Sequence, residues 1–261
     1  MNQTIKYYLA KIVFHTSSNF RFKNTVFLLG HMRCGSTALT NVLMANNKIN
    51  GYGESHISYN LEYSPALLAI SLIRNGINPF KGELIFDKIL HNNHDSSPDS
   101  SFYNSKAIFM IRHPVSTVIS LCYLAKRAKN LKQSYNDLEV CLDYYISRLK
   151  HLKCMWIRFP ENNRYMLTYE SLLKNTEQQL NALSRKILNN LEIRNEYSSM
   201  CDKWGTGDPI NVHKYNAIKP IKKNPYYESF EEKVWQLENL VTAERLYEEF
   251  LEQSKKLEFI K

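Results

Sequence analysis

The sequence predicts an α/β fold in three layers, in which a mostly parallel sheet is flanked by helices. Two observations carry this prediction. Short apolar runs, typical of buried strands, alternate along the chain with longer segments that have helical spacing of apolar residues. No interior stretch has the composition of a linker. We therefore expect a single domain over residues 1–261.

The elements follow one another in a regular order. Apolar runs predict buried strands at residues 25–29, 84–86, 106–111 and 164–168. Helical periodicity predicts helices at residues 36–46, 64–74, 114–129 and 135–157, then from residue 170, and at 228–255. Prolines near the start of the second and third of these helices support their beginnings. Polar and turn-forming residues predict loops at 91–101 and 202–225.

Composition limits the possible partners and the compartment. Lysine and arginine outnumber aspartate and glutamate by 34 to 25, which suits anionic ligands such as nucleotides, nucleic acid or acidic lipid without choosing among them. No apolar run approaches the roughly 20 residues that a membrane-spanning helix needs. The five cysteines are odd in number and lack C-x-x-C spacing. We therefore expect a cytoplasmic protein without a membrane span.

The stretch "FLLGHMRCGSTAL" has the outline of an anion-binding loop. A predicted strand ends at Gly30, and a helix begins after Gly35, so backbone N–H groups and the positive end of the helix dipole converge there. Arg33 adds a positive charge, and Ser36 and Thr37 add hydroxyl donors. The pattern is also compatible with a tight turn that happens to contain an arginine. Because Ser36 occupies the lysine position of G-x-x-x-x-G-K-[ST], a conventional ATPase or GTPase is disfavoured.

A second anion site is predicted at "IRHPVSTVIS". Arg112 follows a buried strand, Pro114 begins a helix, and Ser120 lies eight residues after the arginine, about two helical turns on. An arginine at a strand end and a hydroxyl on the next helix can bind one phosphate together. Taken alone, this segment is better explained by Arg112 pairing with a carboxylate and by Ser120 lying on a helix without a functional role.

Together the two segments resemble the sulfotransferases that use 3′-phosphoadenosine 5′-phosphosulfate (PAPS). "GHMRCGSTAL" resembles their 5′-phosphosulfate loop, "RHPVSTVIS" their 3′-phosphate motif, and "YMLTYESLLKN" a downstream strand and helix. The resemblance covers about residues 25–175. It implies the P-loop-like sulfotransferase fold, PAPS as donor, adenosine 3′,5′-bisphosphate as product, and no metal. Two positions, Cys34 and Ser36, depart from the commonest loop but keep small side chains.

The resemblance also assigns residues to the donor. Those expected to contact the 5′-phosphosulfate are Arg33, Cys34, Gly35, Ser36, Thr37 and Ala38, and those expected to hold the 3′-phosphate are Arg112 and Ser120. Farther along, the segment 204–220 contains His213, Lys214 and Lys219. It occupies the place of a loop that closes over the nucleotide in these enzymes.

Catalytic residues are predicted from two further segments. "GYGESHISY" resembles the G-E-E stretch of tyrosylprotein sulfotransferases, and Glu54 lies 54 − 33 = 21 residues after Arg33, about as far as the catalytic glutamate in those enzymes. Glu54 is therefore the favoured general base, with His56 as the alternative base or an acceptor contact. "LIFDKILHN" resembles a D-K-x-P segment without its proline. Lys88 is expected to stabilise the bridging oxygen together with Arg33. The alternative is that Lys88 is a solvated surface lysine, with which the same sequence is compatible.

The sequence thus predicts an enzyme that moves a sulfonyl group from PAPS to a hydroxyl of a carbohydrate or another small molecule. His91 and His94 lie in a polar loop and are expected to be solvated, so no metal site is predicted. One alternative is a P-loop kinase with an altered loop. Another is a non-catalytic protein that binds nucleotide or RNA, although no nucleic-acid motif is present, and we expect no such partner.

Overall fold

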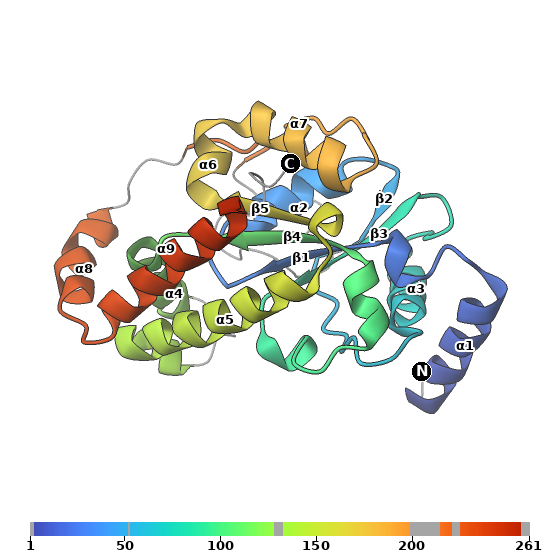
Figure 1. Ribbon diagram of the computed structural model, residues 1–261, viewed down its shortest axis with the longest axis horizontal. Coiled ribbons are helices and arrows are strands. Elements are labelled where there is room, and N and C mark those ends of the chain that lie inside the picture. The colour runs from blue at the N-terminus through green and yellow to red at the C-terminus, as the bar shows by residue number, and fades with distance from the viewer. Residues whose placement is uncertain (1–2, 52, 128–132, 199–214, 221–224, 257–261) are drawn as a thin grey trace.

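The computed structural model describes residues 3–51, 53–127, 133–198, 215–220 and 225–256. Its centre is a five-stranded sheet in the order β2-β3-β1-β4-β5, in which every pair of neighbours is parallel (Figure 1). The strands are β1 (Thr25–Gly30), β2 (Ile49–Asn50), β3 (Leu84–Ile89), β4 (Lys106–Ile111) and β5 (Arg164–Thr168). The predicted α/β fold class is confirmed.

Helices cover both faces of the sheet (Figure 1). One face packs on α2 (Ser36–Met44), α6 (Tyr169–Lys174) and α7 (Thr176–Ile187). The other packs on α1 (Gln3–Thr16), α3 (Ser64–Arg74), α4 (Pro114–Ala125), α5 (Leu138–Arg158) and α9 (Leu240–Lys256). α8 (Pro225–Trp235) lies beside α4, and short 3-10 turns lie at Phe22–Asn24, Asn92–His94, Ser100–Asn104, Gln133–Asn136 and Glu161–Asn163. The strand side chains alternate between the two apolar layers, as the pleat of a sheet requires.

The register of the strands positions the functional region. Leu29 of β1 pairs with Ile89 of β3 and with Phe109 of β4. The carboxyl ends of these three strands therefore lie at one edge of the sheet, and the loops that follow them meet there. In open parallel sheets this edge is where ligands bind.

Several predicted elements have the expected bounds, and others do not. The helix at 64–74 and the strands at 106–111 and 164–168 match α3, β4 and β5. The helix α1 and the two-residue strand β2 were not predicted. The helix expected from residue 170 is divided into α6 and α7 at Asn175, whose φ of −136° and ψ of 52° interrupt the helix. The helix expected at 228–255 is divided into α8 and α9, joined by a turn in which the Leu237 N–H donates to the Val234 carbonyl.

Candidate active site

The loop between β1 and α2 has the geometry of an anion-binding turn. Gly35 has a φ of 93°, and a Cβ at this position would lie 2.5 Å from the Tyr169 ring, so only glycine fits. Arg33 also has a positive φ, 67°. Gly35 caps α2 without a side-chain hydrogen bond. The first turn of α2 therefore faces the loop with backbone N–H groups that the helix itself does not satisfy.

The side chains of the loop lie in different places. Arg33, Thr37 and Ala38 are half-buried at the edge of the sheet, whereas Ser36 is buried. Cys34 is fully buried under the loop; burial raises the pKa of its thiol, and its N–H donates to the His31 carbonyl. The structure thus brings Arg33, Thr37 and Ala38 to the site. The Cys34 side chain faces the apolar layer between the sheet and α2.

Arg112 joins the two predicted anion motifs. It follows β4, and its Nη1 donates to the Arg33 carbonyl at 3.3 Å. Its guanidinium lies 4.2 Å above the centre of the Tyr169 ring, a cation–π contact that fixes its plane. Among the described residues, nothing accepts a hydrogen bond from the buried Arg112 Nε, so part of the donor capacity of this side chain is unused.

Arg33 contacts the other half of the second motif. Its Nε donates to Ser120 Oγ at 2.8 Å, although 87 residues separate them in sequence. Ser120 lies on α4 and is 1% exposed. Arg33, Arg112 and Ser120 therefore form one cluster at the carboxyl ends of β1 and β4. Two cations and a hydroxyl so close together favour an anion with more than one charge.

The His31 side chain accepts a hydrogen bond from the backbone of Arg112. The Arg112 N–H donates to His31 Nε2 at 3.1 Å, so the ring proton is on Nδ1, which lies 2.9 Å from the Met32 carbonyl and donates to it. Burial, and to a smaller extent the charge of Arg112, lower the pKa of His31 to about 3, against the opposing effect of the hydrogen bond with Met32. His31 is consequently a neutral structural residue of the loop.

Glu54 and Lys88 form an ion pair at the neighbouring strand end. Lys88 Nζ lies 2.9 Å from Glu54 Oε1, and the two side chains are 1% and 20% exposed. Burial opposes the ionisation of Glu54, but the adjacent ammonium of Lys88 outweighs it and holds the pKa of this carboxyl below its ordinary value. The structure thus places the predicted base beside the predicted oxygen-stabilising lysine, with the carboxylate as the more exposed partner.

Asp87, which was not among the predicted site residues, supports the segment of Glu54 from the opposite face of β3. Its carboxylate accepts hydrogen bonds from the Ser55 N–H at 3.0 Å, from the Ser55 hydroxyl, and from the Tyr59 hydroxyl at 2.5 Å. Burial raises its pKa to about 6, against the effect of these hydrogen bonds. Asp87 therefore fixes the segment that carries Glu54. The sequence feature that could have identified Asp87 is its position directly before Lys88 in "LIFDKILHN".

Three histidines lie around Glu54. His56 is exposed and has a φ of 54°, and its ring centre lies 5.5 Å from that of His94. His91 packs near the Tyr144 ring at 5.8 Å. Burial lowers the pKa values of His91 and His94, which are half-buried rather than solvated. No group of three potential metal ligands occurs within the described residues.

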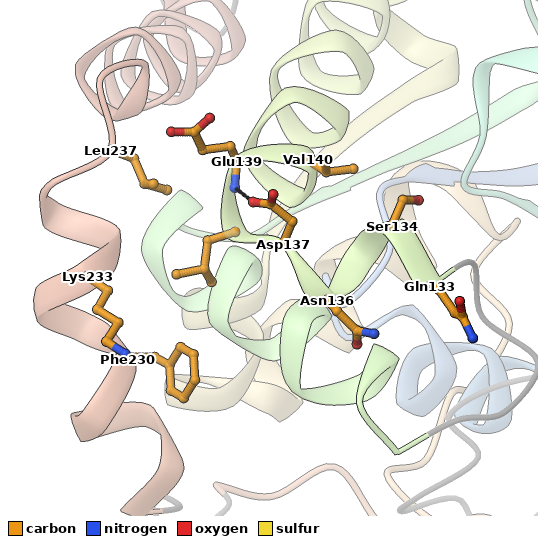
Figure 2. Close-up of a pocket in the computed structure, with 10 residues that line it drawn as sticks. Gln133, Ser134, Asn136, Asp137, Glu139, Val140, Phe230, Lys233 and Leu237 are labelled. Carbon is orange, nitrogen blue, oxygen red and sulfur yellow. Dashed lines mark hydrogen bonds between the residues drawn. The ribbon is translucent and has the colours of Figure 1, made fainter.

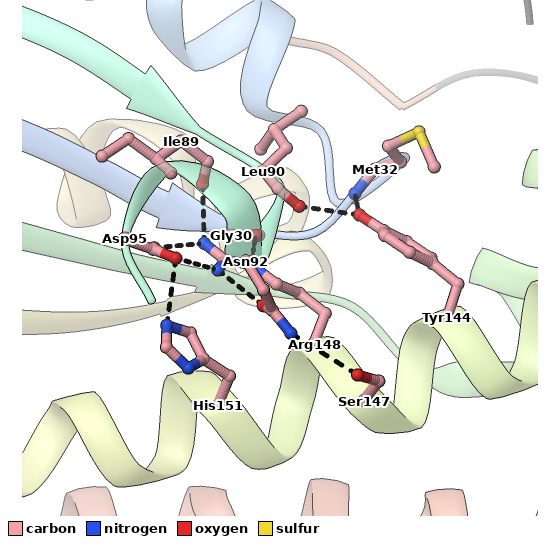
Figure 3. A network of polar contacts seen from close by, with 10 residues as sticks. All are labelled: Gly30, Met32, Ile89, Leu90, Asn92, Asp95, Tyr144, Ser147, Arg148 and His151. Atoms are coloured by element: carbon pink, nitrogen blue, oxygen red, sulfur yellow. Dashed lines mark hydrogen bonds and ion pairs between the residues drawn. The ribbon is translucent and has the colours of Figure 1, made fainter. Parts of the chain in front are cut away.

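A polar network on α5 connects the carboxyl ends of β1 and β3 (Figure 3). The buried Arg148 donates from Nε to the Gly30 carbonyl and from Nη2 to the Ile89 carbonyl, at 2.8 and 2.9 Å. It also binds both carboxylate oxygens of Asp95, at 2.8 and 2.9 Å. Arg148 is thus satisfied in a bidentate ion pair and two backbone contacts, the arrangement a buried guanidinium requires.

Tyr144, one turn before Arg148, extends this network to the loop. The Met32 N–H donates to the Tyr144 hydroxyl at 2.8 Å, and that hydroxyl donates to the Leu90 carbonyl at 2.8 Å (Figure 3). His151, one turn after Arg148, lies 3.0 Å from Asp95. None of the four side chains of this network was among the predicted site residues: Asp95, Tyr144, Arg148 and His151. The only signal was polar residues at positions 144, 148 and 151 of a helix whose periodicity is otherwise apolar.

A large groove lies away from these residues. It has a volume of about 910 Å³ and is open to solvent between α8 and the start of α5 (Figure 2). Its walls include Asp137, Glu139, Phe230, Lys233 and Leu237. None of the predicted site residues lines it, so the groove is separate from the candidate active site. The part of the predicted nucleotide-covering segment at 204–214, with His213 and Lys214, lies outside the described residues; Lys219 lies 5.2 Å from the centre of the Tyr215 ring.

Part of the sequence matches a family profile, and the fold is similar to that of solved structures. Residues 99–193, which include Arg112 and Ser120, match the sequence profile described as "Sulfotransferase family". The fold is similar to the sulfotransferase domain from the curacin biosynthetic pathway, with a TM-score of 0.51 and 17% identity over 86% of this chain and 96% of that one. It is also similar to the sulfotransferase domain of the Synechococcus PCC 7002 olefin synthase, with a TM-score of 0.51 and 15% identity over 82% and 95%. No curated protein matches the sequence.

Proposed function

Because residues 99–193 match the sulfotransferase family profile, we propose that the protein transfers the sulfonyl group of PAPS to a hydroxyl group of a small molecule or carbohydrate. The observation that carries this proposal is the contact of Arg33 Nε with Ser120 Oγ at 2.8 Å. It unites the loop after β1 with the arginine–serine motif after β4. A nucleotide with phosphate groups at both its 5′ and 3′ positions needs two such anion sites side by side.

The residues around this contact suit the donor. Arg112 presents a guanidinium with an unused donor and a plane fixed by Tyr169. The left-handed turn at Gly35 lets the backbone approach an anion closely. We assign the 3′-phosphate to Arg112 and Ser120, and the 5′-phosphosulfate to Arg33 and the start of α2, through Gly35, Ser36, Thr37 and Ala38. Cys34 contributes at most through its backbone, because its side chain is buried.

The bound donor supplies an electrophilic sulfonyl group and a phosphate leaving group. The acceptor oxygen forms a bond to sulfur, the bond from sulfur to the bridging oxygen breaks, and the electron pair of that bond remains on the phosphate. In this proposal Glu54, ionised at neutral pH, takes the proton of the acceptor hydroxyl. A carboxylate of lowered pKa suffices if the proton leaves late, when the bond to sulfur has made the hydroxyl acidic.

Lys88 is proposed to stabilise the oxygen of the leaving phosphate. Its ammonium is paired with Glu54 before the reaction. Protonation of Glu54 removes the negative charge that holds Lys88, and the ammonium is then available to the oxygen on which charge develops. Lys88 therefore balances first the negative charge of Glu54 and then that of the leaving oxygen. Little water has to reorganise, because the Lys88 side chain is buried. His56, exposed beside Glu54, is proposed as an acceptor contact or as the alternative base.

A kinase is the competing enzyme class. A P-loop kinase needs a lysine on the β- and γ-phosphates and a hydroxyl on magnesium, and Ser36 stands at the lysine position. A protein that binds RNA without catalysis would not need the buried Glu54–Lys88 pair. We also propose a cytoplasmic location, which the odd number of cysteines supports.

Two measurements test the proposed function. Calorimetry compares the affinities of adenosine 3′,5′-bisphosphate and AMP, and we expect the former to bind at least about ten-fold more tightly because it carries the extra phosphate. Incubation with PAPS labelled in its sulfonyl group and a panel of phenols, alcohols and sugars should label at least one acceptor. Equal affinities for the two nucleotides, or magnesium-dependent turnover of ATP in place of sulfonyl transfer, would overturn the proposal.

A further inference from the structure

Helix α1 carries an apolar stripe that faces solvent. Its large exposed side chains recur at positions i, i+3, i+4 and i+7, which places them on one face of the helix. They are Ile5, Tyr8, Leu9 and Ile12, with exposed fractions of 53%, 71%, 41% and 52%. The opposite face, with Ala10 and Phe14, is buried against the rest of the protein. One apolar face is enough to hold a helix on a protein, so the second face is unexplained by the fold.

The clustering distinguishes this stripe from ordinary surface residues. Single exposed apolar side chains are normal in proteins. Among the described residues, four of the nine large exposed apolar side chains lie on α1 alone. Others, such as Ile157 on α5 and Val241 on α9, are spread over the molecule and provide natural controls.

The surroundings of the stripe are positively charged. Residues 1–24, which comprise α1 and the turn after it, contain no aspartate or glutamate but four lysines and arginines, whereas Glu62, beside Tyr63, is an exposed acidic residue near α1. Lys11 is exposed on α1 and lies 5.5 Å from the centre of the Tyr63 ring. Arg74, at the end of α3, is close enough to Lys6 to add to the lowering of the pKa that burial causes in that amine. Ile73, next to Arg74, is itself 49% exposed.

We propose that α1 docks the protein onto an anionic lipid bilayer, with its apolar stripe at the boundary between headgroups and acyl chains and Lys6, Lys11 and Arg74 against the headgroups. An apolar stripe flanked by lysine and arginine is typical of helices that lie in the plane of a membrane surface. No helix among the described residues has the length and apolar content to cross a bilayer. The docking is therefore peripheral.

Charge favours this occupant over a second copy of the chain. A two-fold dimer brings the same patch of both copies together, so the cations around α1 would face one another. An anionic bilayer accepts the apolar side chains and supplies opposite charge at the same surface. Acidic lipid thus matches both properties of the patch.

The position of α1 is compatible with catalysis at the membrane. α1 leads through the turn at Phe22–Asn24 to the amino end of β1, whereas the candidate active site lies at the carboxyl ends of the strands. In Figure 1, α1 lies at the far right and α4, which follows Arg112, lies at the left. Docking through α1 therefore leaves the donor loop open to solvent.

Vesicle flotation tests the proposal with the full chain and without donor or acceptor, so its outcome is independent of the proposed sulfonyl transfer. The vesicles contain phosphatidylcholine alone or a mixture with phosphatidylglycerol. We expect flotation only with the anionic lipid, and weaker flotation as salt increases. The double substitution Tyr8→Ser/Ile12→Ser should lower partitioning about ten-fold or more. Lys11→Gln should lower it about five-fold.

Matched controls and alternative outcomes make the test decisive. Ile157→Ser and Val241→Ser remove equally exposed apolar groups elsewhere and should float as the unmodified protein does. Circular dichroism and thermal unfolding check that every variant is folded. Equal flotation with both lipids, no flotation, or an equal loss in the controls would overturn the proposal. So would light scattering that detects a dimer in solution that Tyr8→Ser/Ile12→Ser abolishes, because the stripe would then bind a second copy.

Discussion

Lys88 Nζ lies 2.9 Å from Glu54 Oε1, and the lysine side chain is almost completely buried while the carboxylate is partly open. A buried ammonium needs its counter-charge, so Lys88 orients Glu54 as well as shifting its pKa. The open side of the pair is the carboxylate, which is the side an acceptor hydroxyl can reach. This relationship yields the first prediction.

Glu54→Gln should lower the rate of sulfonyl transfer on the order of 10²–10⁴-fold, because glutamine keeps the shape of glutamate but cannot accept a proton. The affinity for adenosine 3′,5′-bisphosphate should change little. Because the pKa of Glu54 lies below its ordinary value of 4.5, we expect the acid limb of the rate profile below that pH. Stopped assays across pH, with calorimetry of each variant, measure both effects.

His56→Ala is the matched control for the base, since His56 lies two residues from Glu54 and is exposed. We expect a modest effect on the Michaelis constant and little on the turnover rate. If His56→Ala abolishes turnover while Glu54→Gln does not, the base is His56.

Arg112→Ala should weaken the binding of adenosine 3′,5′-bisphosphate by about 1.5–3 kcal/mol, because it removes a charge-assisted contact with the 3′-phosphate. AMP, which lacks that phosphate, should bind the variant and the unmodified protein almost equally. Calorimetry with both nucleotides measures the difference. Lys174→Ala, which removes a positive charge from α6 outside the cluster, is a suitable control. A loss of affinity shared by AMP would place the 3′-phosphate elsewhere.

Sulfonyl transfer should be unaffected by EDTA. The loop lacks the lysine of magnesium-dependent P-loop enzymes, and we assign the charge of the leaving phosphate to Arg33, Lys88 and the start of α2. Initial rates before and after chelation, and after magnesium is restored, measure the effect. Activity that disappears with EDTA and returns with magnesium would refute this electrostatic account.

Acid should destabilise the fold through His31. The folded protein holds the pKa of this imidazole at about 3, below its ordinary 6.5, so the unfolded chain binds the extra proton more readily. The contribution to the free energy of unfolding is therefore complete above pH 6.5 and is lost as pH falls toward 3. Between pH 7 and pH 4.5 the loss is about 2–3 kcal/mol.

His31→Asn removes this titration while keeping a donor and an acceptor at the position. Urea unfolding at several pH values should give a smaller slope of stability against pH for the variant than for the unmodified protein. Comparing the two proteins cancels the titration of Asp87 and of other groups that they share. Parallel slopes would contradict the assignment of His31 as a buried neutral histidine.

Local patterns predicted much of the fold and the proximity of the two predicted anion motifs. The apolar runs before Arg33 and Arg112 are long enough to define buried strands, and parallel strands place their carboxyl ends together, so these two side chains had to lie near each other. The contact between Arg33 and Ser120 follows from the same geometry. Which residues bind PAPS and which group is the base remain predictions, as does the single-domain organisation.

The rest depends on tertiary contacts that no local pattern contains. Periodicity along α5 cannot tell a solvated arginine from Arg148, which is buried because Asp95 and two backbone carbonyls meet it from other segments. His91 and His94 lie in a polar stretch, and only the packing of that stretch near Glu54 buries them. The helix α1 escaped prediction because it has apolar residues on both faces, which hides its helical period.

The network on α5 also has a consequence for hydrogen exchange. Tyr144 takes the amide proton of Met32 as its hydrogen-bond partner, and Arg148 holds the last carbonyl groups of β1 and β3. The Met32 amide therefore cannot exchange with solvent until Tyr144 withdraws. We therefore expect the ends of β1 and β3 to behave as one cooperative unit, and to open together when α5 detaches from the sheet.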